Sequence, residues 1–230
     1  MKPLEEKVNV KPVFTRMIHG SAYEGPCRTG RMEDLTPEAD RRRGKEGFAK
    51  FVADLKANVG PDIELLAPVC IEWSDDFVVP ESELAKLEPD IYDTDLVLTS
   101  GSQYPSIAIR QRYKKPVGVI GWVVSVDVTA YLRAQGLEGY AFLDFEDLNH
   151  FASLLRVRKA FRKTKLLVAL EGNIITMGVV SGICDLENLK TRYGVDSAWV
   201  PAGDIVDEMD HLSAEGLKEA EELTDKLIAN

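Results

Sequence analysis

Short apolar runs alternate with amphipathic stretches along this chain. Seven runs have the length of strands, and they lie at 13–18, 63–71, 95–99, 116–120, 139–143, 165–170 and 198–200. The second run is interrupted by Pro68. Other segments predict helices, and they lie at 36–58, 80–87, 126–135, from 144 onward, 204–209 and 213–228. The pattern therefore predicts strands and helices in alternation.

Residues that favour helix ends mark several of these boundaries. Thr36 precedes Pro37, an order typical of an N-cap followed by the first helical residue. The predicted helix then carries an apolar stripe, made of Phe48, Phe51, Val52 and Leu55. Asp144 is the predicted cap of a long helix, and Gly136 ends the helix before it.

This alternation indicates an α/β fold. Strands that are apolar throughout are typical of parallel sheets covered on both faces, so we expect a mostly parallel, Rossmann/flavodoxin-like sheet with flanking helices. We expect a first α/β domain at 1–163, followed at 164–230 by the start of, or complement to, a second α/β domain. Ligands of such folds bind beyond the carboxyl ends of the strands, which directs attention to the loops there.

Composition limits the classes of function. The 230 residues are 45% hydrophobic, enough to bury a full core, and no eighteen-residue apolar window predicts a membrane span. A net charge of −10 argues against nucleic acid, which needs a basic face, whereas a neutral sugar or a protein partner is compatible with it. Cys27, Cys70 and Cys184 are odd in number and far apart, and 1–10 does not resemble a secretory signal. We therefore expect a cytoplasmic protein.

Charge is unevenly distributed near the end of the chain. Basic residues concentrate in one short segment, at Arg156, Arg158, Lys159, Arg162, Lys163 and Lys165. The simplest interpretation is a solvated helix end whose cations complement the helix dipole. The last thirty residues hold nine acidic residues against Lys218 and Lys226.

The loop at 19–31 follows the first predicted strand and is long and glycine-rich. It contains no phosphate-loop pattern. Arg28 (with Arg31 nearby) can hold a hydroxyl-rich or anionic ligand, and the alternative is a loop packed against a neighbouring subunit. His19, Glu24 and Cys27 are possible metal ligands, but their spacing matches no standard site.

Three further strand ends carry side chains suited to ligand contact. Gln103 and Tyr104 can meet sugar hydroxyls and a ring face, unless 100–105 is an ordinary turn. Trp122 either stacks on a sugar or seals a domain edge. Trp73 is flanked by Glu72, Asp75 and Asp76, which either bind a cation or are solvated.

Other chemistries lack their sequence patterns. The glycines at 172–182 do not form Gly-x-Gly-x-x-Gly, so a nicotinamide cofactor is unsupported. His19, His150 and His211 do not combine with a serine or cysteine into a recognisable nucleophile set.

The stretch 151–228 resembles the L-fucose/L-arabinose isomerase family at the junction of its first and second domains. The resemblance rests on a basic helix at 156–161, a Gly-rich, Met-containing loop at 172–182, Cys184-Asp185, Arg192-Tyr193-Gly194-Val195 and an acidic segment at 204–208. The first 150 residues match the family in the order of their elements.

The resemblance implies a role in carbohydrate metabolism, namely aldose–ketose isomerisation through an enediol bound to a divalent metal, typically manganese. In the family the metal ligands come from a later part of the protein, so the resemblance assigns no metal ligand or cofactor within this chain. The family's first domain lends residues to a neighbouring subunit's sugar site. By position, the candidate sugar-binding residues are His19, Arg28, Gln103, Tyr104 and Trp122.

Three hypotheses follow. The chain is part of an isomerase, inactive alone, that requires a homo-oligomer or a partner chain supplying the metal site. Alternatively, it is a non-catalytic sugar-binding or regulatory α/β module. As a third hypothesis, it is an unrelated flavodoxin-like binding protein that shares only βαβ architecture.

Overall fold

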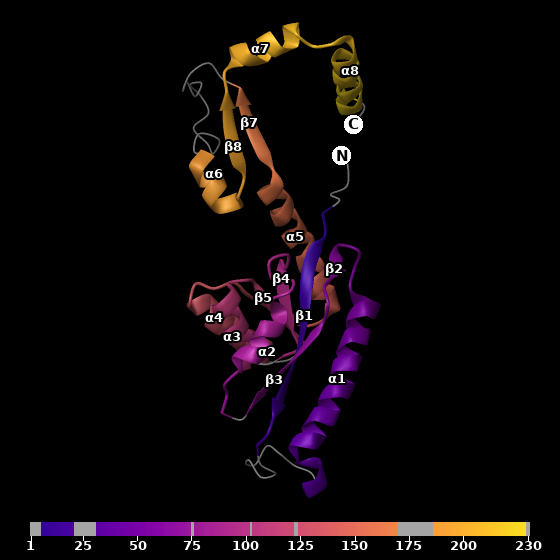
Figure 1. Cartoon of the computed structure of the whole chain (residues 1–230), viewed down its shortest axis with the longest axis vertical. Coiled ribbons are helices and arrows are strands. Elements are labelled where there is room, and N and C mark those ends of the chain that lie inside the picture. Colours follow the sequence, from indigo (N-terminus) through magenta and orange to yellow (C-terminus); the bar gives the residue numbers. More distant parts are fainter. Residues whose placement is uncertain are drawn as a thin grey trace. The chain divides into compact units, whose positions relative to one another are not determined.

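A computed structural model describes residues 6–20, 31–74, 76–101, 103–121, 124–169 and 186–228. The chain divides into two compact units, one at Glu6–Arg156 and one containing the described residues from Val157 onward (Figure 1). The division lies within helix α5 (Phe145–Lys163), whereas the sequence placed it after residue 163. Among the described residues, no helix is long and apolar enough to cross a membrane.

The first unit is built on a parallel sheet. Its strands are β1 (Val8–Ile18), β2 (Ile63–Leu65), β3 (Val69–Ser74), β4 (Leu96–Thr99), β5 (Val117–Ile120) and β6 (Gly139–Phe142). The order is β2-β1-β4-β5-β6, and β3 follows β2 along the same edge of β1. Counting β2 and β3 as one interrupted strand gives the flavodoxin-like order. The predicted α/β fold with a mostly parallel sheet is confirmed.

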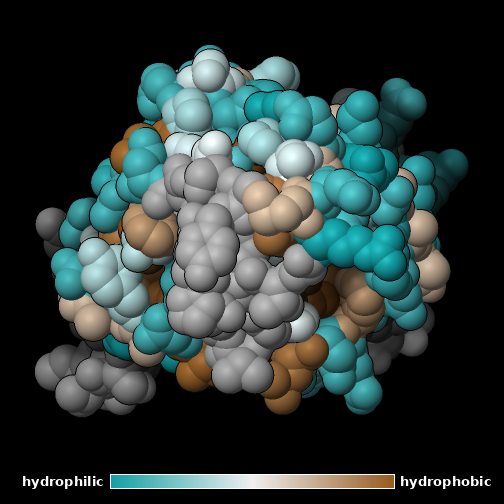
Figure 2. All heavy atoms as spheres, turned by 90° about the horizontal axis from the view of Figure 1, so that it is seen from below, coloured by the Kyte–Doolittle hydropathy of each residue, from teal (hydrophilic) through white to brown (hydrophobic). Residues whose placement is uncertain are grey.

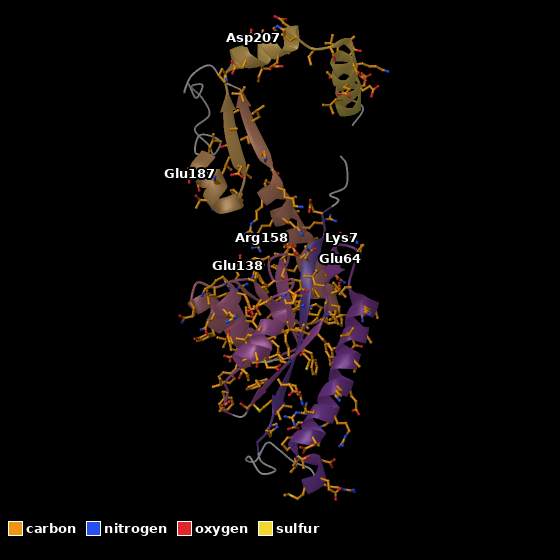
Figure 3. The ribbon with its side chains drawn as sticks, viewed as in Figure 1. Lys7, Glu64, Glu138, Arg158, Glu187 and Asp207 are labelled. Atoms are coloured by element: carbon orange, nitrogen blue, oxygen red, sulfur yellow. The ribbon has the colours of Figure 1, made fainter. Side chains whose placement is uncertain are left out.

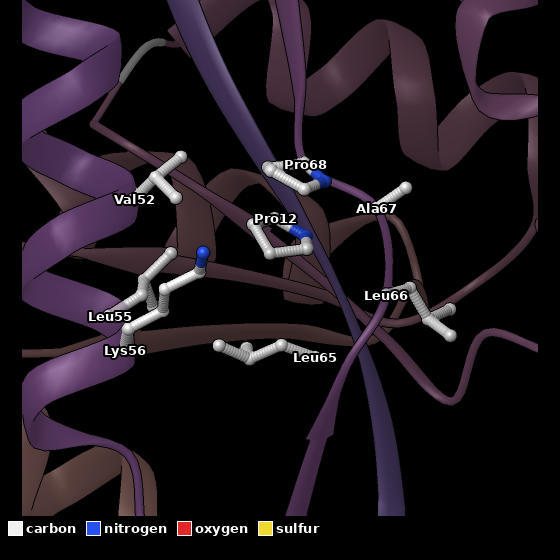
Figure 4. Close-up of a pocket in the computed structure, with 8 residues that line it drawn as sticks. All are labelled: Pro12, Val52, Leu55, Lys56, Leu65, Leu66, Ala67 and Pro68. Atoms are coloured by element: carbon white, nitrogen blue, oxygen red, sulfur yellow. The ribbon is translucent and has the colours of Figure 1, made fainter.

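Two prolines explain the interruption between β2 and β3. The Leu66 N–H donates to the Val10 carbonyl at 2.9 Å, so the even-numbered residues of β1 turn their backbone groups toward β2 and β3. Pro12 is the next even residue and has no N–H to donate. Across from it, Pro68 has none either, and an apolar pocket of about 160 Å³ opens beside the break (Figure 4).

Strand β1 is longer than its apolar run suggested. The sequence predicted a strand at 13–18, but β1 begins at Val8. The prediction missed the first half of the strand because polar residues occupy part of it. Lys11 is buried, and its ammonium lies 2.8 Å from the Asp90 carboxylate. The Asn9 side-chain amide donates to the Asp93 carbonyl at 2.9 Å. These pairings let polar side chains lie in a central strand.

Helices cover both faces of the sheet (Figure 1). One face packs against α1 (Pro37–Asn58) and α5, and the other against α2 (Glu81–Leu84), η2 (Ala85–Leu87), α3 (Gln103–Tyr113) and α4 (Val124–Ala134). Successive side chains of β4 point to opposite faces of the sheet. Leu96 and Leu98 pack in the core beneath α1 and α5, and Val97 packs in the core on the other face.

The predicted helix caps at Thr36 and Asp144 are confirmed. Oγ1 of Thr36 accepts the Ala39 N–H at 3.2 Å, and Oδ1 of Asp144 accepts the backbone N–H of Glu146 at 2.9 Å. Helix α3 was missed in the sequence. Pro105 suggested a turn at 100–105, but a proline in the first turn is compatible with a helix.

The second unit has a smaller framework. Its elements after α5 are β7 (Lys165–Ala169), α6 (Leu186–Tyr193), β8 (Asp196–Val200), α7 (Ala202–Asp210) and α8 (Ala214–Ile228). Strands β7 and β8 pair in parallel, and Gly194, at φ 74°, follows the end of α6. Among the side chains described in this unit, Val195 alone is buried.

Helix α1 lies close to β1 because it carries glycines on the facing side. A Cβ at Gly47 would lie 2.7 Å from Cζ of Phe14. The Phe14 ring packs between Phe48 and Phe51, with ring centroids 6.1 and 5.9 Å away, so it has little room to move.

Replacing Gly47 with alanine is expected to lower the free energy of unfolding by about 1–3 kcal/mol, because the new methyl group overpacks against Phe14. Inside an unconstrained helix the same change would raise it by up to about 1 kcal/mol. Urea unfolding followed by circular dichroism measures the effect. In a Phe14→Leu background the change should be neutral or stabilising, and an equal loss in both backgrounds would contradict this explanation.

Candidate functional site

The connections of the sheet reverse direction at β1. The chain passes from β1 to β2 and β3 on one side, and then crosses to β4 on the other. The carboxyl ends of β1 and β4 therefore form the topological switch point, where open α/β sheets bind ligands. Figure 2 views the molecule from the end at which β1 and β3 terminate, and hydrophilic and hydrophobic residues are interspersed there.

Strand β1 continues beyond the end of β4. It pairs with β4 only over Val10–Val13, but with β3 as far as Ile18. A pocket of about 500 Å³ lies beside this extension. Its lining comes from β1 and the residue after it, β3 and the loop after it, the residues that follow β4, and the start of α3. It consists of Thr15, Arg16, Met17, His19, Trp73, Phe77, Ser100, Gly101, Gln103 and Tyr104.

The extension of β1 turns backbone groups toward the pocket. The Ser100 N–H donates to the Val13 carbonyl at 3.1 Å, and Oγ of Ser100 accepts the Thr15 N–H at 3.1 Å. Odd-numbered residues of β1 thus direct their peptide groups toward β4. Met17 continues this alternation where β4 has already ended at Thr99. Its peptide groups are therefore directed to the side on which the pocket opens.

Three aromatic rings gather on one side of the pocket. Tyr104 lies 5.8 Å from Trp73 and 4.8 Å from Phe77, measured between ring centroids. Trp73 is buried, whereas Phe77 and Tyr104 are 52% and 41% exposed. Phe77 has a φ of 62°, a left-handed conformation that is strained for a bulky residue. Asp76 supports this turn by accepting the Val78 N–H at 3.0 Å.

Three buried polar atoms among the pocket residues have no hydrogen-bond partner in the described part of the chain. They are Oγ1 of Thr15, Nε of Arg16 and Nε1 of Trp73, and Thr15 and Trp73 are each only 9% exposed. A buried polar group without a partner costs about 1–3 kcal/mol. A ligand that supplies both an acceptor and a donor would remove this cost, so these atoms favour a polar, hydrogen-bonding ligand.

A buried carboxylate joins the end of β1 to helix α1. Asp40 accepts hydrogen bonds from Arg16 Nη2 at 3.2 Å, Arg43 Nη2 at 2.8 Å, the His19 backbone N–H at 3.1 Å and His19 Nδ1 at 2.8 Å. Gly44 gives the Arg16 side chain room, since a Cβ there would lie 3.2 Å from Cγ of Arg16. These bonds hold the last residues of β1 against the first turns of α1.

The hydrogen bonds also determine the charge of Asp40. Burial raises the pKa of this carboxyl, but the hydrogen bonds from His19 and Arg43 outweigh burial and hold the pKa well below its usual range. An ionised carboxylate can only accept hydrogen bonds, so Nδ1 of His19 carries a proton. A neutral His19 ring then has its lone pair on Nε2, the form in which histidine acts as a base.

The structure brings three of the five predicted sugar-binding residues to one pocket, namely His19, Gln103 and Tyr104. Arg28 and Trp122 lie outside the described residues. The sequence reasoning did not select Thr15, Arg16, Asp40 or Phe77, and it considered Trp73 only for its acidic neighbours. The sequence signal that placed the Trp73 ring at this edge was its position just after the apolar run at 63–71.

The possible cation sites receive no further support. Glu24, Cys27 and Asp75 lie outside the described residues, while His19 bonds Asp40 and Asp76 supports the turn at Phe77. Across the described ranges, no three His, Cys, Asp or Glu side chains are grouped so that they could hold a metal ion. The divalent metal that the family resemblance implies therefore stays a prediction.

Comparison with known proteins adds no assignment. No protein-family model matches the sequence, and no curated protein matches it significantly. The resemblance to the L-fucose/L-arabinose isomerase family stays a prediction. Its loop at 172–182 and Cys184-Asp185 lie outside the described residues.

Replacing Asp40 with asparagine is expected to lower the free energy of unfolding at pH 7 by roughly 1–3 kcal/mol, because the partly exposed guanidinium groups of Arg16 and Arg43 lose the buried carboxylate that accepts their hydrogen bonds. The pKa of Asp40 is lower in the folded state than its unfolded value of about 3.9. The contribution of Asp40 to the free energy of unfolding is therefore complete at pH values well above about 3.9, and it is lost as the pH falls below that value.

The stability difference between wild type and Asp40→Asn should thus narrow between about pH 4 and pH 2, as measured by urea unfolding at each pH. Asp54→Asn on the same helix is the control, since Asp54 forms an exposed pair with Lys50 and should matter by less than about 1 kcal/mol. A difference that is independent of pH would show that Asp40 is not held ionised.

Proposed function

We propose that this chain binds an aldose, or a closely related polyhydroxylated small molecule, in the pocket at the switch point. The observation that carries the proposal is the combination of an aromatic cluster with buried, unpartnered polar atoms in one pocket. A sugar presents both an apolar C–H face and an edge of hydroxyl groups, so it can use both features at once.

The chemistry of the lining suits this ligand class. Tyr104 and Phe77 offer exposed ring surface for the C–H face. Sugar hydroxyl groups both donate and accept, so they match the N–H of Trp73 and the hydroxyl of Thr15. The pocket volume of about 500 Å³ lies within the usual range for small-molecule sites. The net charge of −10 disfavours a polyanionic ligand.

The family resemblance supports the same ligand class. In the isomerase family the first domain contributes to a sugar site, and the pocket lies at strand ends of the corresponding part of this chain. A sugar-binding module that works with a metal site supplied by a second copy or by a partner chain is consistent with both observations. No chemical step is assigned to a metal here, because no three described His, Cys, Asp or Glu side chains are grouped to hold one.

Isothermal titration with L-fucose and L-arabinose tests the proposal. Thr15→Val removes a hydroxyl group at nearly constant side-chain volume, and Trp73→Phe removes the indole N–H together with part of the ring. Each is expected to weaken binding at least about threefold to tenfold. Tyr104→Ala should weaken it further by removing ring surface. Tyr92→Ala is the control, because Tyr92 is 90% exposed and lies outside the pocket lining. The absence of binding by wild type to either sugar or to related aldoses would reject the proposal.

Aldose–ketose isomerisation is a second candidate function. The observation that favours it is the His19–Asp40 pair at the pocket, because isomerisation moves a proton between C1 and C2 and a histidine oriented by a carboxylate can carry that proton.

The purified chain with Mn²⁺ and L-fucose is nevertheless expected to show no aldose–ketose interconversion, since the described residues form no group of three side chains able to hold the metal. Chromatographic detection of the ketose measures it. Turnover that is lost in His19→Asn would overturn that expectation and make the chain an isomerase in its own right.

A further inference from the structure

The open edge of β1 beside the pocket centres on Met17. The peptide groups of odd-numbered residues in β1 face the side of β4, and β4 no longer pairs with β1 beyond Val13. The Thr15 N–H donates to Oγ of Ser100 at 3.1 Å, and the His19 N–H donates to Oδ2 of Asp40 at 3.1 Å. Between them, neither the N–H nor the C=O of Met17 has a hydrogen-bond partner in the described part of the chain.

The N–H and the C=O of one strand residue have a defined spacing. In a parallel strand ψ is about +115°, so the N–Cα–C=O torsion is about −65° and both groups point to the same side. Two hydroxyl oxygens on adjacent ring carbons are likewise separated by two carbon atoms, and their torsion is about 60° unless both are axial. One hydroxyl can therefore accept from the Met17 N–H while its neighbour donates to the Met17 C=O.

We propose that Met17 determines the specificity of the pocket and that its main chain binds two neighbouring, gauche hydroxyl groups of the ligand. The inference rests on the proposed sugar-binding function and narrows its ligand class to sugars and other polyols in which such a diol is free. A site that hydrogen-bonds particular hydroxyl groups discriminates against analogues that lack one, because its own polar groups are then left without partners.

The side chains around Met17 suit a sugar bound in this way. Met17 pairs in register with Trp73 of β3, so the two side chains lie on the same face of the sheet. The Trp73 ring contacts Tyr104, which in turn contacts Phe77, and all four residues line the pocket. A sugar whose diol is held at Met17 can therefore place its C–H face against these rings.

A strand from another chain is a poorer match for this edge. Strand addition uses main-chain groups on successive residues that face the open side. The N–H groups of Thr15 and His19, which precede and follow Met17 on that side, are already bonded within the chain. The edge therefore favours a small ligand that needs one donor and one acceptor.

A proline at position 17 tests the main chain directly. Met17→Pro removes the N–H without breaking a hydrogen bond of the sheet, and an extended Arg16 is compatible with a following proline. Met17→Leu is the matched control, because it changes the side chain and keeps the N–H. By isothermal titration, Met17→Pro should bind the aldose about threefold to tenfold more weakly than Met17→Leu. Equal binding by the two folded variants would overturn the inference.

A distant control lies at the other end of β1. Glu64 pairs there with Lys7, which immediately precedes the strand (Figure 3). Glu64→Gln should bind the aldose like wild type. Circular dichroism verifies that each variant is folded.

Monodeoxy analogues of the bound aldose identify the diol. On wild type, the hydroxyl groups whose removal weakens binding about threefold to tenfold should include two on adjacent carbons. For one of these two, the loss should disappear in Met17→Pro, because the N–H that donated to that hydroxyl is absent. Losses that are unchanged in Met17→Pro for every analogue would overturn the inference.

Nuclear magnetic resonance of wild type makes the test independent of whether Met17→Pro folds. The chain holds five methionines, so labelling with ¹⁵N-methionine gives few amide signals, and the Met17 signal is the one missing in Met17→Leu. The aldose should shift the Met17 amide and leave that of Met209, on α7, unshifted. Aldose binding with an unshifted Met17 amide overturns this inference alone, whereas a wild type that binds no aldose rejects the proposed function and this inference with it.

Discussion

Strand β1 extends beyond the strand beside it, and a buried carboxylate holds that extension in place. The Asp40 carboxylate accepts hydrogen bonds from Arg16, from Arg43 and from both the backbone N–H and Nδ1 of His19. These bonds tie the end of β1 to helix α1. Strand β3 pairs along the other edge and thereby brings Trp73 to the same level. Without this extension, β1 and β4 would end together and the pocket would lose the wall formed by Thr15 and the residues after it.

The pocket combines strain, burial and unpartnered polar atoms. Phe77 keeps a left-handed backbone, and Thr15 and Trp73 keep polar atoms buried without partners in the described chain. Each feature lowers the free energy of unfolding, and features of this kind are concentrated at binding sites, where ligand binding compensates for them. The two apolar cores of the surrounding sheet contribute the stability that offsets these unfavourable features.

The two units differ in how they reach stability. In the first unit, apolar residues such as Leu98 and Val97 alternate between two closed cores. In the second unit, amphipathic helices leave residues such as Leu217 and Met209 exposed. The first unit therefore buries most of its apolar side chains in its own cores, whereas the described part of the second unit leaves many of them exposed.

The local pattern of apolar and capping residues was sufficient to predict much of the fold. The apolar runs located the strands, and Thr36 and Asp144 located helix starts, because burial and capping depend on residues close together in sequence. The parallel order followed from strand–helix alternation, and with it the expectation that His19, Gln103 and Tyr104 lie at one edge. The sequence missed the first half of β1, since Lys11 became compatible with a buried strand only through Asp90, far along the chain.

Only the tertiary structure decided the chemistry at the switch point. The bond between His19 and Asp40, the contact of Trp73 with Tyr104 and the buried hydroxyl of Thr15 each depend on elements distant in sequence. By itself, the sequence determined the alternation of strands and helices, with α3 missed, and it directed attention to the edge of the sheet where the strands end. Which side chains meet there was decided by how far β1 extends beyond β4, a property of pairing between strands that no local pattern encodes.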